Sequence, residues 1–139
     1  MKELQLPAAR PGKCRDRSVA IVGRLAELGV TLPLARQGAA LVGAEPIIAV
    51  DVRSNKLEMA KQFGATHVVN ASHVDPVSAI RNIAGGLGVH YAFEAIGLVA
   101  EPFVQAIECT RKRGLTVYVG HAPFNTPITL DARILMPEK

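Results

Sequence analysis

Two glycines stand between a short apolar run and a segment with helical periodicity, where backbone groups could hold an anion. Gly23 ends the apolar run Ser18–Gly23, and Gly29 comes directly before the helical segment that begins at Val30. A glycine turn between a strand and a helix lets backbone N–H groups and the positive end of the helix face a phosphate. The sequence therefore predicts phosphate contacts for Gly23, Gly29 and Val30.

Asp51 follows this turn at a spacing that suits the binding of a ribose. It ends the apolar run Pro46–Asp51 and lies 22 positions after Gly29. A carboxylate about 20 residues beyond a glycine turn can bind the ribose hydroxyls of an adenosine and repels a 2′-phosphate, which favours NAD over NADP. Arg53 tempers this preference, because a nearby arginine can accept a 2′-phosphate. The spacing leaves a second interpretation open, in which Asp51 faces solvent or caps the helix at Ser54.

Apolar runs alternate with helical segments along the chain, and this alternation predicts the order β-α-β-α-β-α-β-α-β. The expected strands are apolar enough to be buried on both faces, which is typical of a parallel sheet covered on both sides. These strands are Ser18–Gly23, Pro46–Asp51, His67–Asn70, Val89–Ile96 and Leu115–Gly120, and the expected helices are Val30–Val42, Ser54–Phe63, Asp75–Ala84 and Pro102–Lys112. The predicted fold class is α/β, a doubly wound parallel sheet of the Rossmann type with about five to six strands in three layers.

The ends of the expected helices carry residue types that suit them. Asp75 is expected to cap its helix, with Pro76 at the first position. The basic residues of 111–113 are expected at the end of the last helix, where the dipole favours cations, and the tail beyond them shows no clear further helix. Residues 1–17 are expected to form an N-terminal arm or linker, and residues 18–139 a dinucleotide-binding domain that is truncated near its last strand.

Composition and charge exclude several classes of protein. The chain has 139 residues, which suits one domain, and a net charge of +4. Its basic residues form no stripe with interleaved aromatics, which disfavours nucleic-acid binding, and no apolar run approaches the roughly 20 residues that span a bilayer. Cys14 and Cys109 have no metal-ligand spacing and suit free thiols in a reducing cytoplasm, the expected location.

Three strings of the sequence resemble one family together. PIIAVDVRSNKLEMAKQFGATHVVNAS, VHYAFEAIG and RGLTVYVGHAPFNTPITLDARIL closely resemble the nucleotide-binding domain of zinc-dependent alcohol dehydrogenases in the medium-chain dehydrogenase/reductase family, over roughly residues 18–135. The resemblance implies that Asp51 and Lys56 bind the adenosine ribose. It also implies that backbone of two turns lies along the nicotinamide half of the cofactor, at Ala95, Ile96, Gly97, Val119, Gly120 and His121. Without the resemblance, Lys56 would be taken as a solvated lysine and the two glycines as ordinary turn residues.

The sequence also departs from the family pattern. Aligning the glycine turn with the family makes residues 24–27 an insertion, puts Gly29 in the place of the second glycine and Leu32 in the place of the third. Pro33 fits only in the first turn of the helix, so we expect a longer turn and weaker dinucleotide affinity. The family's catalytic domain with its zinc ligands has no counterpart here, and the four histidines show no ligand spacing. We expect no zinc site in this chain and assign no catalytic residue.

These observations predict an NAD(H)-binding domain of an alcohol dehydrogenase-like oxidoreductase. Such a domain would present the nicotinamide cofactor for hydride transfer to or from an alcohol or aldehyde. The alternative is a non-catalytic remnant that acts as a binding or oligomerisation module with weakened or lost cofactor binding. In the family the last strand of the sheet pairs across a dimer interface, which implies a homodimer through the sheet edge.

Overall fold

The structure, a computed structural model, describes residues 17–22, 37–121 and 124–136. Within these ranges it forms five strands, three complete helices, a helical stretch over residues 37–41 and a short 3₁₀ helix. The elements are β1 (Val19–Val22), β2 (Ile47–Asp51), α2 (Ser54–Gln62), β3 (His67–Asn70), α3 (Pro76–Ile83), β4 (Val89–Glu94), α4 (Ala100–Glu108), β5 (Thr110–Tyr118) and η1 (Ala132–Leu135). None of the helices within these ranges is long and apolar enough to cross a membrane.

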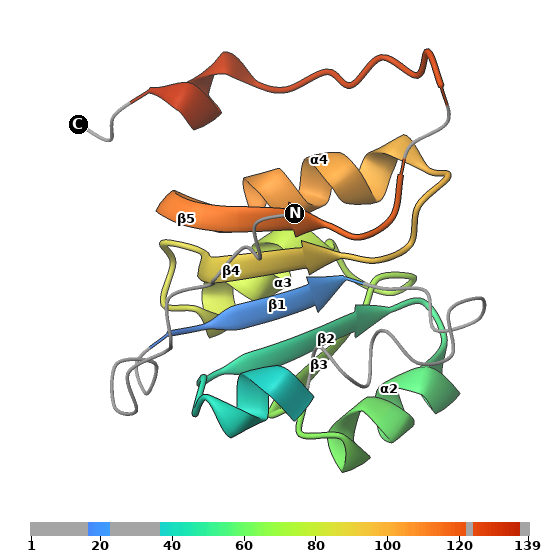
Figure 1. Cartoon of the computed structure of the whole chain (residues 1–139), viewed down its shortest axis with the longest axis vertical. Coiled ribbons are helices and arrows are strands. Elements are labelled where there is room, and N and C mark those ends of the chain that lie inside the picture. The colour runs from blue at the N-terminus through green and yellow to red at the C-terminus, as the bar shows by residue number, and fades with distance from the viewer. Residues whose placement is uncertain (1–16, 23–36, 122–123, 137–139) are drawn as a thin grey trace, which may run out of the picture.

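The strands form one parallel sheet in the order β3-β2-β1-β4-β5 (Figure 1). Val19 of β1 lies opposite Ile47 of β2 on one side and Tyr91 of β4 on the other. The chain therefore builds outwards from β1 to β3 and then returns to place β4 on the other side of β1. This return is the switch in strand order that a doubly wound sheet requires.

Helices cover both faces of the sheet and bury apolar clusters against each face. On one face, Ala39 of the helical stretch packs near Ile21, and Ala60 of α2 packs with Ala49. On the other face, Ile80 of α3 belongs to the cluster that also holds residues of β1, β2 and β4 and Ala106 of α4. In Figure 1, α2 lies in front of the sheet and α3 behind it. The predicted α/β fold with three layers is confirmed.

The start of α3 follows the sequence prediction. A carboxylate oxygen of Asp75 accepts a hydrogen bond from the backbone N–H of Ser78 at 2.9 Å, and Pro76 is the first residue of the helix. Proline is suited to that position because its missing N–H would have no partner inside the helix. Hydrogen bonds from Ser78 also lower the pKa of Asp75.

The predicted end of the last helix is wrong. α4 ends at Glu108, and β5 begins two residues later at Thr110, which pairs with Val89 of β4. The register of this pair shifts between Val89 and Tyr91, and Arg113 takes a left-handed φ of 63° in the irregular part of the strand. The basic residues of 111–113 therefore lie in a strand. The cation at the end of α4 is Arg81, whose Nε donates to the Glu108 carbonyl at 3.1 Å.

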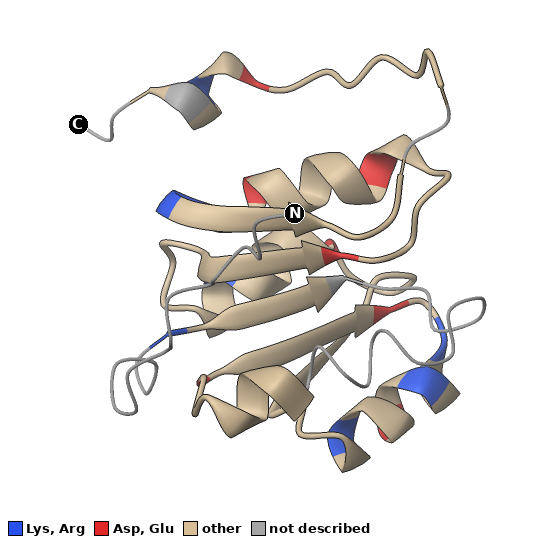
Figure 2. Ribbon diagram, in the orientation of Figure 1, with Lys and Arg blue, Asp and Glu red and all other residues tan. Residues whose placement is uncertain are grey.

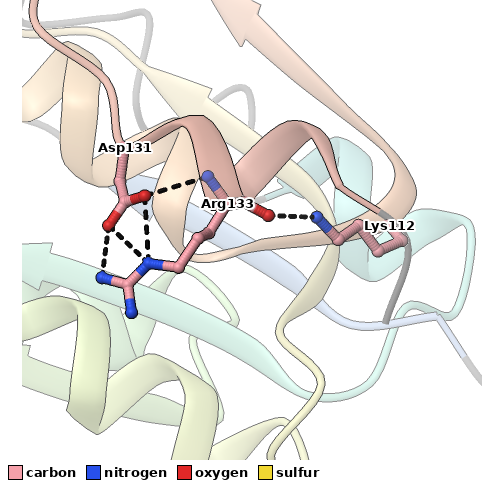
Figure 3. A network of polar contacts seen from close by, with 3 residues as sticks. All are labelled: Lys112, Asp131 and Arg133. Carbon is pink, nitrogen blue, oxygen red and sulfur yellow. Dashed lines mark hydrogen bonds and ion pairs between the residues drawn. The ribbon is translucent and has the colours of Figure 1, made fainter. Parts of the chain in front are cut away.

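The tail contains a short 3₁₀ helix that the sequence analysis did not predict. Asp131 holds its first turn, because a carboxylate oxygen accepts from the backbone N–H of Arg133 at 2.9 Å and the carboxylate pairs with the Arg133 guanidinium. Figure 3 shows Lys112 reaching the same turn from β5, where its Nζ donates to the Arg133 carbonyl at 3.2 Å. This side chain therefore ties the tail to the sheet.

Candidate functional site at the carboxyl ends of the strands

The carboxyl ends of β1, β2 and β4 meet at one edge of the sheet. The last residue of β1, Val22, lies in register with Val50 of β2 and with Glu94 of β4. Acidic residues end both flanking strands, and Figure 2 shows them at the arrow tips of β2 and β4. Ligands of open α/β sheets bind outside this edge at the switch in strand order, so the candidate site lies here.

Asp51 is the buried last residue of β2, with a relative exposure of 5%. Its Oδ1 accepts a hydrogen bond from the backbone N–H of Arg53 at 2.9 Å, and Arg53 is the N-cap of α2. The solvent-facing interpretation is therefore wrong. The carboxylate is held in the turn that leads into α2 through its bond to the N-cap residue Arg53, and Ser54 is the first residue of that helix.

Other polar residues surround the end of β2. Asn70, which lies in register with Asp51, donates from Nδ2 to the Ser54 hydroxyl at 3.2 Å. Lys56 is half-buried on the first turn of α2, and Arg53 is exposed. The structure thus gathers Asp51, Arg53 and Lys56 at the start of one helix.

The two turns predicted to face a nicotinamide lie against each other. The Glu94 carbonyl at the end of β4 accepts from the N–H groups of Val119 at 2.8 Å and Gly120 at 3.3 Å. In return, the N–H of Leu98 donates to the carbonyl of His121 at 2.7 Å. These bonds clamp residues 94–98 to residues 119–121, so Ala95, Ile96 and Gly97 lie next to the second turn.

Gly97 and Gly120 lie where the two turns leave no room for a side chain. A Cβ placed on Gly120 would lie 2.3 Å from the Gly97 nitrogen and 2.6 Å from its Cα. Gly97 has a φ of +66°, a conformation that favours glycine. Both residues are therefore glycines for steric reasons, whatever binds at this edge of the sheet.

Glu94 is a residue of this site that the sequence analysis did not single out. Its side chain is fully buried. Oε1 accepts from the backbone N–H groups of Ile96 at 2.6 Å and Gly97 at 3.0 Å. Oε2 is also buried and accepts no hydrogen bond from the described part of the chain. The available signal was the string VHYAFEAIG, in which an acidic residue interrupts an apolar strand just before a glycine turn.

Tyr118 supports the site from the end of β5. Its ring stacks on Phe103 of α4 with 4.6 Å between ring centroids, and its hydroxyl donates to the Phe103 carbonyl at 3.0 Å. Burial raises the pKa of Tyr118 to about 12, and the negative charge of Glu94 adds to this effect. Tyr118 therefore stays a hydrogen-bond donor at neutral pH and fixes α4 against the strand that carries the second turn.

The predicted phosphate-binding turn lies outside the described residues. This applies to Gly23, Gly29 and Val30, to the insertion at residues 24–27 and to Leu32 and Pro33. Of the helix expected over Val30–Val42, the structure describes residues 37–41 as helical. The predicted N-terminal arm is described only at Arg17, whose guanidinium donates to the Tyr91 hydroxyl at 2.9 Å.

Within the described ranges, no three His, Cys, Asp or Glu side chains are grouped so that they could hold a metal ion. Burial raises the pKa of the Cys109 thiol to about 12, which leaves it protonated at neutral pH and unsuited as a ligand or nucleophile. His90 lies in β4, where its Nδ1 accepts from the backbone N–H of Ser18 at 3.1 Å. The described residues therefore do not fit a zinc ion, and no chemical step here involves one.

The fold and the site together define an α/β domain of the nucleotide-binding class, with a buried carboxylate after β2 and two clamped turns at the switch in strand order. Residues 33–139 match the family model described as zinc-binding dehydrogenase. The chain belongs to this family, whose matched part is an NAD(P)-binding dehydrogenase domain. The resemblance found in the sequence is confirmed.

Three relatives illustrate the similarity. Alcohol dehydrogenase 2 of Tanacetum cinerariifolium is 39% identical over 97 residues, which cover 67% of this chain and 25% of the relative. Benzyl alcohol dehydrogenase from Acinetobacter calcoaceticus has a TM-score of 0.76 and 36% identity, over 86% of this chain and 32% of that one. A candidate zinc-binding dehydrogenase from Sinorhizobium meliloti 1021, solved bound to NADP, has a TM-score of 0.74 and 29% identity, over 86% of this chain and 34% of that one. This chain spans about a quarter to a third of the length of these relatives.

Proposed function

We propose that this chain is the NAD(H)-binding domain of an alcohol dehydrogenase-like oxidoreductase. It would present the nicotinamide for hydride transfer to or from an alcohol or aldehyde. The relatives described as alcohol dehydrogenases support this activity class, and the comparisons do not favour the alternative of a non-catalytic module. The bound nicotinamide supplies the hydride chemistry, and this chain's residues hold and orient the cofactor.

The observation that carries the proposal is the clamp between the turns at 94–98 and 119–121, beside the end of β1. Three backbone hydrogen bonds join the turns, and neither Gly97 nor Gly120 places a side chain where the turns meet. A flat aromatic ring that binds along these turns would meet backbone held in one geometry. Because this edge is also the switch in strand order, the described residues fit a dinucleotide there.

The proposal gives the other predicted residues roles along the cofactor. Asp51 and Lys56 bind the adenosine ribose, with Arg53 beside them, and the glycine turn of residues 23–30 holds the phosphates. The buried carboxylate of Asp51 supports a preference for NAD, because a 2′-phosphate would bring a second negative charge against it. Alcohol-binding and metal-binding groups come from outside the described residues in this proposal.

The test is a titration of the chain with NADH, followed by nicotinamide fluorescence, with NADPH in parallel. We expect saturable binding that is weaker than in intact dehydrogenases because of the lengthened turn, and tighter for NADH than for NADPH. No binding of either cofactor at millimolar concentration would overturn the proposal. Equal or tighter binding of NADPH would overturn only the preference assigned to Asp51.

The proposal includes a homodimer through the outer edge of β5. In the described sheet β5 pairs only with β4, and Leu115 of β5 has a relative exposure of 54%. A long strand edge with an exposed apolar residue is a template for pairing with another chain. Sedimentation velocity over a range of protein concentrations tests it, and a monomer at all concentrations would refute it.

A further inference from the structure

Glu94 occupies a position where an ionisable side chain is unusual. It is the last residue of β4, fully buried, and lies in register with Val22 of β1 and Tyr118 of β5. A buried carboxylate loses its hydration, so it remains in a fold only where hydrogen bonds replace water. The bonds that Glu94 makes therefore indicate what it does.

Glu94 bonds to both turns of the candidate site through different groups. Its side-chain Oε1 accepts from the N–H groups of Ile96 and Gly97 on its own turn. Its main-chain carbonyl accepts from Val119 and Gly120 on the other turn. One residue thus connects four backbone N–H groups from the two segments proposed to line the nicotinamide.

The side-chain bonds have no substitute within the described chain. No other acceptor is recorded for the N–H groups of Ile96 and Gly97 there. Bonds from N–H groups to a carboxylate are short and about twice as strong as neutral ones. Removing the acceptor would leave two N–H groups at least partly buried, so the turn would have to move to find water.

From these contacts we infer that Glu94 is a positioning residue for the nicotinamide-side turns, which sets the backbone geometry of residues 96 and 97 through Oε1. The inference rests on the proposed function only for the identity of the ligand. The second oxygen is not needed for this role, since Oε2 lies 3.0 Å from the position of a Cβ on Gly120 and accepts no bond from the described residues. A neutral amide in the same place can therefore accept the same two hydrogen bonds through its oxygen.

The first experiment measures backbone amide exchange by NMR without cofactor. In Glu94→Met, which keeps the size but removes the acceptor, we expect the amides of Ile96 and Gly97 to exchange about 10- to 100-fold faster than in the wild type. Glu94→Gln retains an acceptor oxygen and should restore protection to within about threefold of the wild type, about 0.6 kcal/mol. Glu58→Met, on an exposed helix face, is the control with the same change of charge. Unchanged exchange at both amides in Glu94→Met would overturn the inference.

The second experiment compares NADH with ADP-ribose, which lacks only the nicotinamide. We expect Glu94→Met to weaken NADH binding about 10-fold or more while ADP-ribose binding stays within about twofold, and Glu94→Gln to recover the NADH affinity. Equal weakening of both ligands, or of neither, would contradict a role at the nicotinamide half. If the wild type binds neither ligand, the proposed function fails, and the amide exchange still decides whether Glu94 positions the turn.

If Glu94→Met does not fold, Glu94→Asp provides the same test. It keeps the carboxylate but shortens the side chain by one carbon–carbon bond, about 1.5 Å. The bonds of 2.6 and 3.0 Å to Ile96 and Gly97 would then be broken or require the turn to shift. We expect the same faster exchange at both amides, and wild-type protection in Glu94→Asp would overturn the inference.

Discussion

Replacing Gly120 by alanine tests the close contact between the two turns. The new Cβ would lie 2.3 Å from the Gly97 nitrogen, 2.6 Å from its Cα and 3.0 Å from Glu94 Oε2. Ordinary contacts of a Cβ with backbone atoms are about 3.4 Å or longer, so the turns must separate by roughly 1 Å. That separation would stretch the bonds from Val119 and Gly120 to the Glu94 carbonyl, now 2.8 and 3.3 Å.

The expected loss of stability follows from this overpacking. Forcing an extra methyl group into a close-packed site costs about 1–3 kcal/mol. For a domain of this size, each 1 kcal/mol lowers the melting temperature by about 2–8 °C. The same separation should weaken NADH binding more than ADP-ribose binding, because only the nicotinamide half lies along these turns in the proposal. Thermal unfolding followed by circular dichroism and fluorescence titration measure the two effects.

Gly38→Ala is the matched control. Nothing lies within 4 Å of a Cβ at Gly38, which is in the helical stretch over residues 37–41. Alanine should there stabilise the fold by about 0.5–1 kcal/mol, because glycine is a poor helix former. The reasoning would be refuted by a Gly120→Ala protein that melts at the wild-type temperature and binds NADH unchanged.

Three further predictions follow from described contacts. Asp75→Ala should lower the free energy of unfolding by about 1 kcal/mol through loss of the α3 cap, measured by urea titration. Because bonds from Ser78 lower the pKa of Asp75, the wild type should exceed the variant in free energy of unfolding above about pH 3.9, and this excess should disappear as the pH falls through the folded-state pKa of Asp75. An excess that stays constant down to about pH 2 would contradict the prediction. Asp51→Asn should weaken NADH binding and reduce the preference over NADPH, with Glu58→Gln as control, and an unchanged ratio of the two dissociation constants would exclude Asp51 from the ribose site. Leu115→Lys should shift sedimentation toward the monomer, because charge on a strand edge opposes pairing; an unchanged distribution would place any interface elsewhere.

The sheet and its layers could be predicted because short stretches of the sequence indicate each strand and helix. β2 is apolar at four successive positions and buried throughout, so it suits only a sheet covered on both faces. The Asp75–Pro76 pair marks the start of α3 through a bond that forms within four residues. The two turns proposed to face the nicotinamide were predicted from the family resemblance, and the structure shows the contacts that join them.

The errors arise where distant parts of the chain decide the local structure. Helical periodicity continues past Glu108, but pairing of Thr110 with Val89 draws the next residues into β5. Glu94 was overlooked because an acidic residue at a strand end usually faces water. Glu94 is buried at the end of a strand that lies between β1 and β5, and that position within the sheet is not visible in a single sequence.

The Gly97–Gly120 contact also limits how this site can vary. No larger residue fits at Gly120 without displacing backbone, and Gly97 holds a φ of +66° with a Cβ position only 3.2 Å from the His121 nitrogen. Diversity in the ligands that this edge of the sheet binds must therefore come from the residues on either side of Gly120. Val119 and His121 are exposed on either side of Gly120. A library that randomises these two positions and keeps both glycines would test new ligand preferences while the backbone of the two turns stays unchanged.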